Sequence, residues 1–460
     1  MEAFRVHQAA VVTVIVVATA WGCGPGRTAV LDRPRAALAA MLIADLVYML
    51  WATVPFIPMG IDESYFAINA QRYRGHDLYN CWIRTPLPGL MGALTDFHPP
   101  LVGLVAKELA AVAVFAIARP GLGLGGALWA AWLTVTSSRL ARYGAYYLNE
   151  TYAAASVAGL VWAAAAGRSV WAALCAGLGF ASRWQLLVLA PLAAWSGWQR
   201  GRLRAACLAV VVFALPALVT IPLTEVDPLR ALEQNRGHAV GFVERLVGYL
   251  QPKVGFGLGV VSLALALVGV LEAWRRRQPG LRWSAAAFGV CTASVLAVGM
   301  VMPNYMTAAV PAGCVLVAAG CLRLAGMGRW GARRPLVVAA AVAVVVLHAL
   351  PIDPPKARSE RRARPQAAIL ADRAAFLTAL GDAPLYSELE FLAVCAVLAR
   401  PVHAVLGPGT DQPEGVSMDW EGRWAFCTRD QLQPGSTVLT REPGAHEVLW
   451  RAGTLALVRW

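Results

Sequence analysis

Long apolar runs dominate the first 350 residues of this 460-residue chain, with short charged loops between them. The longer runs extend over about 17–22 residues, the length of α-helix that crosses ~30 Å of hydrocarbon. Charged residues make up only 15% of the chain, against about 25% in soluble domains. The pattern excludes an ordinary soluble enzyme, a disordered protein and a disulfide-rich secreted module. It predicts an all-α polytopic membrane protein.

The apolar runs predict about twelve transmembrane helices. The first run is short enough to be mistaken for a signal peptide, but it has almost no basic n-region and no small-x-small cleavage site. Two further short runs, 170–181 and 184–198, are also predicted as separate spans. The predicted spans are 8–22, 36–58, 99–118, 123–137, 151–166, 170–181, 184–198, 205–223, 254–274, 283–302, 306–322 and 335–350.

Alternate loops differ in charge, and this difference predicts the topology. One set of six loops holds sixteen Arg and a single acid, Asp32, whereas the other set holds nearly all the loop acids. Because cytoplasmic loops carry an excess of Lys and Arg, the Arg-rich set is predicted to be cytoplasmic. The N-terminus, the loops 59–98 and 224–253, and the tail then lie outside. The sixteen Arg are at positions 27, 33, 35, 119, 168, 200, 202, 204, 275, 276, 277, 282, 323, 329, 333 and 334.

The tail, residues 351–460, differs in composition from the rest of the chain. It contains 12 basic and 13 acidic residues, for a net charge of −1. Residues 1–350 contain 28 basic and 14 acidic residues, for a net charge of +14, and the two parts together give the overall +13. Basic chains can bind nucleic acid, but these Arg lie in short loops between apolar runs and report topology instead. The sequence therefore predicts a transmembrane domain over 1–350 and a small extracytoplasmic α/β domain over 351–460. Its expected helices are 366–380 and 390–398, and its expected strands are 384–387, 401–406, 436–440 and 455–460.

Some ionisable residues lie well inside the predicted spans. Asp45 lies near the middle of the second span, and Lys107 and Glu108 lie about a third of the way into the third span. Charges in hydrocarbon are costly and are usually paired or functional. An Asp45–Lys107 pair between neighbouring spans would meet this requirement, and its depth favours a structural role.

The first long outer loop contains the most informative polar residues. Asp62 and Glu63 follow a span directly, where a carboxylate meets the aqueous edge of the membrane. The side chains that recur next at helical spacing predict an interfacial helix on the bilayer; they are Phe66, Asn69, Ala70 and Tyr73. The loop closes with His98-Pro99-Pro100 at the start of the next span, where Pro suits the first helical turn.

These motifs resemble those of the GT-C membrane glycosyltransferases that use a polyprenyl-phosphate sugar, in particular the protein O-mannosyltransferase and lipid A aminoarabinose transferase group. The resemblance covers the architecture of the whole chain. Its motifs concentrate in residues 58–155, with weaker matches at 183 and 303–311. The matching segments are Asp62-Glu63 with Tyr65, Arg72 and Arg74, then His98-Pro99-Pro100-Leu101, Asn149-Glu150-Thr151-Tyr152, and Pro303-Asn304-Tyr305 with Pro311.

The resemblance implies roles for these residues. Asp62 would be the catalytic base that takes a proton from the acceptor hydroxyl, with Glu63 assisting. Cations would stabilise the departing phosphate. The implied substrate-binding residues are Tyr65, Arg72, Arg74, His98, Arg142, Glu150, Arg183 and Tyr305. We also expect Asp62, His98 and Glu150 to converge within ~15 Å, a distance that long side chains and a sugar phosphate could bridge.

Most of these residues also have a purely structural interpretation. Asp62 and Glu63 could be solvated loop acids. Arg72 and Arg74 could anchor a helix to lipid headgroups, and His98 could be a polar residue before a Pro turn. Glu150 could be favoured by a helix dipole, and Tyr305 could be an interface aromatic.

Metal and disulfide alternatives stay open at this level. No cofactor is predicted with certainty, although the carboxylates at 62, 63 and 150 could hold a divalent ion. No Cys or His spacing predicts a zinc site. Cys395 and Cys427 would both lie outside the cytoplasm, where they could pair.

Two classes of function fit the sequence. The first is an inverting glycosyltransferase of a bacterial inner membrane that moves a sugar from a polyprenyl-phosphate carrier to an extracytoplasmic lipid, glycan or protein. The second is a twelve-span transporter, although no pair of related halves is visible. A weaker third option is an enzyme similar to O-antigen polymerases or ligases. Membrane lipid is an expected partner in each case, and nucleic acid is not.

The predicted topology is testable by fusing alkaline phosphatase after Trp460. Activity of a β-galactosidase fusion at the same position, which requires the cytoplasm, would contradict both the topology and the location of the site.

Overall fold

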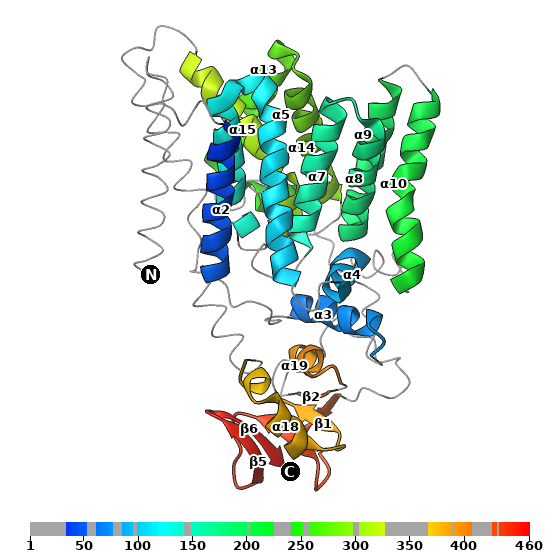
Figure 1. Cartoon of the computed structure of the whole chain (residues 1–460), viewed down its shortest axis with the longest axis vertical. Helices are drawn as coiled ribbons and strands as arrows, with labels where there is room; N and C mark the ends of the chain where they lie inside the picture. Colours follow the sequence, from blue (N-terminus) through cyan, green and yellow to red (C-terminus); the bar gives the residue numbers. More distant parts are fainter. Residues whose placement is uncertain are drawn as a thin grey trace.

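A helical bundle forms most of the computed structural model, and a small sheet lies beyond one of its ends (Figure 1). His98, Arg142 and the predicted spans 8–22 and 335–350 lie outside the residues that the structure describes. The described residues are 34–52, 61–76, 85–94, 99–137, 139–141, 149–199, 203–224, 241–251, 258–297, 303–326, 367–388, 391–400, 402–406, 426–429 and 432–460.

The bundle helices follow the order of the predicted spans. Three of the described helices are long and apolar enough to cross a membrane, at Leu203–Pro222, Pro279–Ala297 and Tyr305–Leu324. The count of twelve spans is therefore not confirmed. The bundle elements are α2 (Pro34–Ala52), α5 (Pro99–Thr136), α7 (Glu150–Ala165), α8 (Ser169–Ser182), η1 (Trp184–Leu189), α9 (Ala190–Trp198), α10 (Leu203–Thr224), α12 (Phe242–Leu250), α13 (Val260–Arg276), α14 (Pro279–Ala297), η3 (Pro303–Ala309) and α15 (Val310–Gly326).

The short runs 170–181 and 184–198 form two separate helical segments, as predicted. Arg183 has extended backbone angles between α8 and η1, so the helix ends there. A Cβ placed on Gly179 of α8 would contact Leu186 and Leu189, which shows that the chain folds back along α8. The boundary between 99–118 and 123–137 is visible too, because Gly123 breaks α5 with φ 71°.

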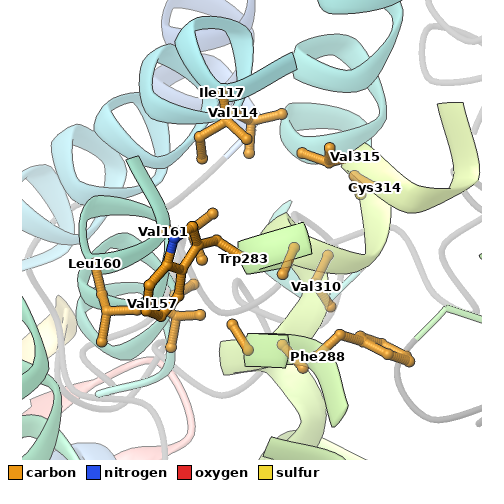
Figure 2. Packing of buried hydrophobic residues seen from close by; sticks show 14 of the residues in the cluster. Val114, Ile117, Val157, Leu160, Val161, Trp283, Phe288, Val310, Cys314 and Val315 are labelled. Carbon is orange, nitrogen blue, oxygen red and sulfur yellow. The ribbon is translucent and has the colours of Figure 1, made fainter. Parts of the chain in front are cut away.

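Buried apolar side chains from four helices fill the centre of the bundle. Figure 2 shows side chains of α5, α7, α14 and α15 that point toward one another. Small residues are frequent among them, which lets the helix backbones approach closely, as is common between helices in membranes. The labelled residues are Val114, Ile117, Val157, Leu160, Val161, Trp283, Phe288, Val310, Cys314 and Val315.

The expected pair between Asp45 and Lys107 is confirmed. Lys107 of α5 is fully buried and donates a hydrogen bond to the carboxylate of Asp45 on α2. Glu108 lies 3.6 Å from the same ammonium group. The pair links two neighbouring helices, in agreement with the structural role that its depth predicted.

The tail contains both predicted helices and all four predicted strands. Two strands, β3 and β5, were missed. The strand order is β3-β2-β1-β4-β6-β5, in which β1 to β4 are parallel and β4, β6 and β5 are antiparallel neighbours. The tail elements are α18 (Arg373–Leu380), β1 (Leu385–Ser387), α19 (Phe391–Leu398), β2 (His403–Leu406), β3 (Phe426–Thr428), β4 (Thr437–Thr440), β5 (Glu447–Ala452) and β6 (Leu455–Arg459).

Cys395 lies in the buried part of α19 and carries a free thiol, so it does not pair with Cys427. Burial raises the pKa of this thiol and keeps it protonated.

Two glycines let α13 and α15 pack closely. A Cβ on Gly269 would overlap the carbonyl oxygen of Leu316, and a Cβ on Gly320 would overlap that of Leu265. No other residue type fits these positions without separating the helices. By contrast, a Cβ on Gly289 of α14 would meet nothing within 4 Å.

Gly269→Ala should therefore destabilise the protein, whereas Gly289→Ala should leave it unchanged or more stable by about 0.5–1 kcal/mol, because Ala is the better helix former. Overpacking of this kind typically costs about 1–3 kcal/mol. Thermal unfolding of the two purified variants in detergent measures the difference. Equal melting temperatures would contradict the close packing.

Candidate functional site

The acidic pair lies on a helix at the end of the bundle that faces the sheet. Asp62 and Glu63 are in the first turn of α3 (Ile61–Tyr73), and the structure describes their backbone but not their side chains. α4 (Pro86–Leu94) lies beside α3, and Figure 1 shows α3 crossing the end of the bundle between the helices and the sheet. The predicted helix after the acidic pair is confirmed.

Protein covers α3 on two sides. All six residues from 65 to 70 are at most 2% exposed, although the sequence predicted a helix lying on the bilayer. Gly89 of α4 brings α4 close to Asn69 and Tyr73. On the other side, Tyr65 and its neighbours belong to one buried cluster with α18, α19 and β1 of the tail. The regular spacing that predicted contact with lipid thus reflects contact with protein.

A polar contact also joins α3 to the tail. The side-chain amide of Gln71 donates to the carbonyl of Ala396 at 3.4 Å. The last four carbonyls of a helix have no partner within it, and Ala396 is in the last turn of α19. Arg373 of α18 donates to a second such carbonyl, that of Leu398, at 3.3 Å. The end of α19 is therefore satisfied from both α3 and α18.

Arg74 binds the end of α4. Its guanidinium donates to the carbonyls of Gly92 at 3.3 Å and Ala93 at 3.0 Å. This is the position in which an Arg interacts favourably with a helix C-terminus. Arg72 is half-buried in the last turn of α3. Contact of either residue with a phosphate stays a prediction.

Three of the predicted substrate-binding residues converge beneath this end of the bundle. Arg183, between α8 and η1, donates to the carboxylate of Glu150 at the start of α7 over 3.2 Å. Both side chains are buried. The guanidinium of Arg183 also lies 4.7 Å from the ring centre of Tyr305 in η3, which is cation–π distance. We call Glu150, Arg183 and Tyr305 the charged cluster.

A hydrogen-bond network that the sequence did not predict connects α4 to the charged cluster. Thr85, directly before α4, donates to the carbonyl of Ser182 at 2.6 Å. Asn149, directly before Glu150, donates to the same carbonyl at 2.8 Å and to the Thr85 hydroxyl at 3.3 Å. The network fixes the ends of α4, α7 and α8 together, so α3 is held over the charged cluster through α4.

Several residues adjacent in sequence to the charged cluster have buried polar atoms without a hydrogen-bond partner among the described residues. Each atom belongs to a residue one or two positions from Glu150, Arg183 or Tyr305. Buried polar groups are almost always bonded, so such atoms call for a partner such as water or a bound ligand. The atoms are Thr151 Oγ1, Tyr152 OH, Trp184 Nε1 and Thr307 Oγ1. Thr151 and Tyr152 belong to the motif Asn149-Glu150-Thr151-Tyr152, which was the feature of the sequence that could have indicated them.

A metal site is not defined by the described residues. Within these ranges no three His, Cys, Asp or Glu side chains lie close enough together to hold an ion. The side chains of Asp62 and Glu63, and all of His98 and Arg142, fall outside the description. The expected convergence of Asp62, His98 and Glu150 therefore stays a prediction.

The fold is similar to that of a solved membrane glycosyltransferase, ArnT. ArnT from Cupriavidus metallidurans in the apo state superimposes with a TM-score of 0.61 at 14% identity, over 92% of this chain and 98% of that chain. The same enzyme bound to undecaprenyl phosphate superimposes with a TM-score of 0.60 at 14% identity, again over 92% of this chain and 98% of that chain. The Archaeoglobus fulgidus oligosaccharyltransferase AglB, in complex with an inhibitory peptide and a dolichol-phosphate, gives a TM-score of 0.45 at 13% identity. The match covers 80% of this chain and 64% of that chain.

Sequence comparison adds no relative. The chain matches no protein-family model, and no curated protein matches its sequence. The likeness to ArnT, a lipid A aminoarabinose transferase, is therefore one of structure. It confirms the GT-C-like fold that the sequence motifs predicted.

Arg183→Met should destabilise the protein because it removes the cation that accompanies the buried Glu150 carboxylate. Breaking a buried ion pair from one side typically costs about 3–5 kcal/mol. The double variant Glu150→Gln Arg183→Met buries no charge and should recover most of this loss. Thermal unfolding in detergent would compare the two variants, and equal losses in both would argue against a direct pair.

Proposed function

We propose that this protein is an inverting membrane glycosyltransferase that moves a sugar from a polyprenyl-phosphate carrier to an extracytoplasmic acceptor. The observation that carries the proposal is the charged cluster with its unsatisfied neighbours, at one end of a bundle that has the ArnT fold. ArnT itself is known bound to undecaprenyl phosphate. A lipid phosphate is the ligand class that suits such a cluster at a membrane surface.

Arg183 is our candidate for binding the departing phosphate. A guanidinium has five N–H donors in a fixed fork, so it can contact one carboxylate and a phosphate at the same time. Glu150 orients it from one side and Tyr305 from another. A cation fixed in advance stabilises the charge that develops on the phosphate without reorganising during the reaction. The buried hydroxyls of Thr151 and Thr307 are candidates for hydrogen bonds to the donor.

Asp62, with Glu63 assisting, is our candidate for activating the acceptor. Its carboxylate would take the proton of the acceptor hydroxyl while that oxygen attacks the anomeric carbon of the sugar. The bond from that carbon to the phosphate oxygen breaks at the same time, and the polyprenyl phosphate leaves with the electron pair. Because attack and departure occur on opposite faces, the anomeric configuration inverts. His98, Arg142, Arg72 and Tyr65 stay candidates for substrate contacts.

The reaction would take place on the extracytoplasmic side of a bacterial inner membrane. The Arg-rich loops are assigned to the cytoplasm by their charge, and α3 and the charged cluster belong to the opposite end. The proposal names the donor as a polyprenyl-phosphate sugar and the acceptor as a lipid, glycan or protein, without specifying the sugar or the acceptor further.

Asp62→Asn should lower turnover by about 10²–10⁴, the usual effect of removing a general base. The substitution keeps size and polarity, so insertion and folding should survive. Glu63→Gln should cost less, since Glu63 only assists. The assay is transfer of radiolabelled sugar from a polyprenyl-phosphate donor to membrane-derived acceptors, with the amount of folded protein measured in parallel.

The matched control is Asp382→Asn, which makes the same change at an exposed position of the tail and should leave turnover unchanged. If Asp62→Asn keeps more than about a tenth of wild-type turnover, above the range for a lost base, Asp62 is not the base. A wild-type protein that transfers no sugar but moves a solute across vesicles would favour the transporter instead.

A further inference from the structure

A second charged region lies at the other end of the bundle from the site. Glu272, in the last turn of α13, is buried and pairs with Arg275, Arg276 and Arg323. Arg323 is near the end of α15, about 27 Å along the helix from Tyr305 at 1.5 Å per residue. This is close to the thickness of a hydrocarbon core. One carboxylate thus faces three cations there.

Two further arginines extend this region toward solvent. Arg277, directly after α13, and Arg282, in the first turns of α14, are both exposed. Within the described residues, neither makes an ion pair. Arg282 lies over the ring of Trp274 at 5.9 Å from its centre. The α13–α14 junction therefore carries a cationic surface that its single buried acid leaves uncompensated.

An exposed apolar stripe leads directly to these arginines. Leu267, Leu271 and Trp274 lie on one face of α13, at helical spacing, and are 58%, 63% and 70% exposed. Trp is common where the hydrocarbon meets the headgroups. The order along the helix is apolar side chain, interfacial Trp, then Arg, which is the order of acyl chain, glycerol and phosphate in a phospholipid.

At the junction, an arginine occupies a backbone conformation that is strained for any residue other than glycine. Arg277 has φ 55°, in the left-handed region, which usually takes Gly at the end of a helix. A side chain that occupies this conformation costs stability relative to Gly. Such an outlier suggests that the side chain serves another purpose.

We propose that the α13–α14 junction binds an anionic phospholipid of the surrounding bilayer, with its phosphate at Arg277 and Arg282 and its acyl chain along Leu267 and Leu271. The cationic surface matches the negative charge of the cytoplasmic leaflet, and it faces that leaflet in the predicted topology. The site is separate from the charged cluster, so it does not depend on the proposed transferase reaction.

The test is native mass spectrometry of the full-length protein titrated with phosphatidylglycerol or phosphatidylcholine. Wild type should bind phosphatidylglycerol more tightly. Arg277→Gln Arg282→Gln should weaken that binding about 25-fold, roughly fivefold for each cation, and weaken phosphatidylcholine binding much less, because the choline cation offsets the charge of its phosphate. Arg277→Gly should weaken it about fivefold and raise the melting temperature of the lipid-free protein, because it relieves the backbone.

Arg168→Gln is the matched control, because Arg168 also lies over a Trp ring, that of Trp162 at 5.3 Å, in another of the predicted cytoplasmic loops. It should change phosphatidylglycerol binding by less than twofold. The proposal is overturned if the double variant binds as tightly as wild type, or if the control loses as much affinity. Displacement of the lipid by an equal concentration of inorganic phosphate would also overturn it, since the site would then take free anions.

Discussion

The cost of burying charge in an apolar bundle governs the arrangement of this protein. Four charged side chains are buried in the described part of the bundle, and each has a partner of opposite charge on another element. The pairs join α2 to α5, α7 to the end of α8, and α13 to α15. Breaking such a pair from one side leaves an uncompensated charge, so the pairs fix which helices are neighbours. The Glu108 carboxylate beside Lys107 is also buried without a hydrogen-bond partner among the described residues. The pair of Glu150 and Arg183 differs from the others in its contact with the Tyr305 ring and in its position at the α3 end of the bundle.

The tail and the end of the membrane bundle both pack against α3. Six successive residues of α3 are buried between α4 and α19, so the acidic pair at its start depends on both parts of the chain for its position. Figure 1 shows why: α3 is the layer between the bundle and the sheet. A helix with six successive buried residues has little freedom to tilt or turn, which suits the proposal that it holds a catalytic carboxylate.

Local patterns in the sequence predicted much of this structure. Strand-like runs that alternate with helical segments predicted four of the six strands. The cost of burying a charge predicted the Asp45–Lys107 pair. The motifs named Glu150, Arg183 and Tyr305 separately, but their contact joins residues far apart in sequence and depends on how η3 packs against α7. The burial of α3 could not be predicted either, because a periodic apolar face looks the same whether lipid or protein covers it. β3 has only three residues, and β5, at the edge of the sheet, has one buried side chain in six, so neither carries a clear apolar pattern.

The most direct test of the central claim is a structure of the protein with undecaprenyl phosphate bound. The account predicts the phosphate at the α3 end of the bundle, with an oxygen about 3 Å from the Arg183 guanidinium and the Asp62 carboxylate on the side of the acceptor. A phosphate held at the opposite end, or at the α3 end without contact with Arg183, would contradict it.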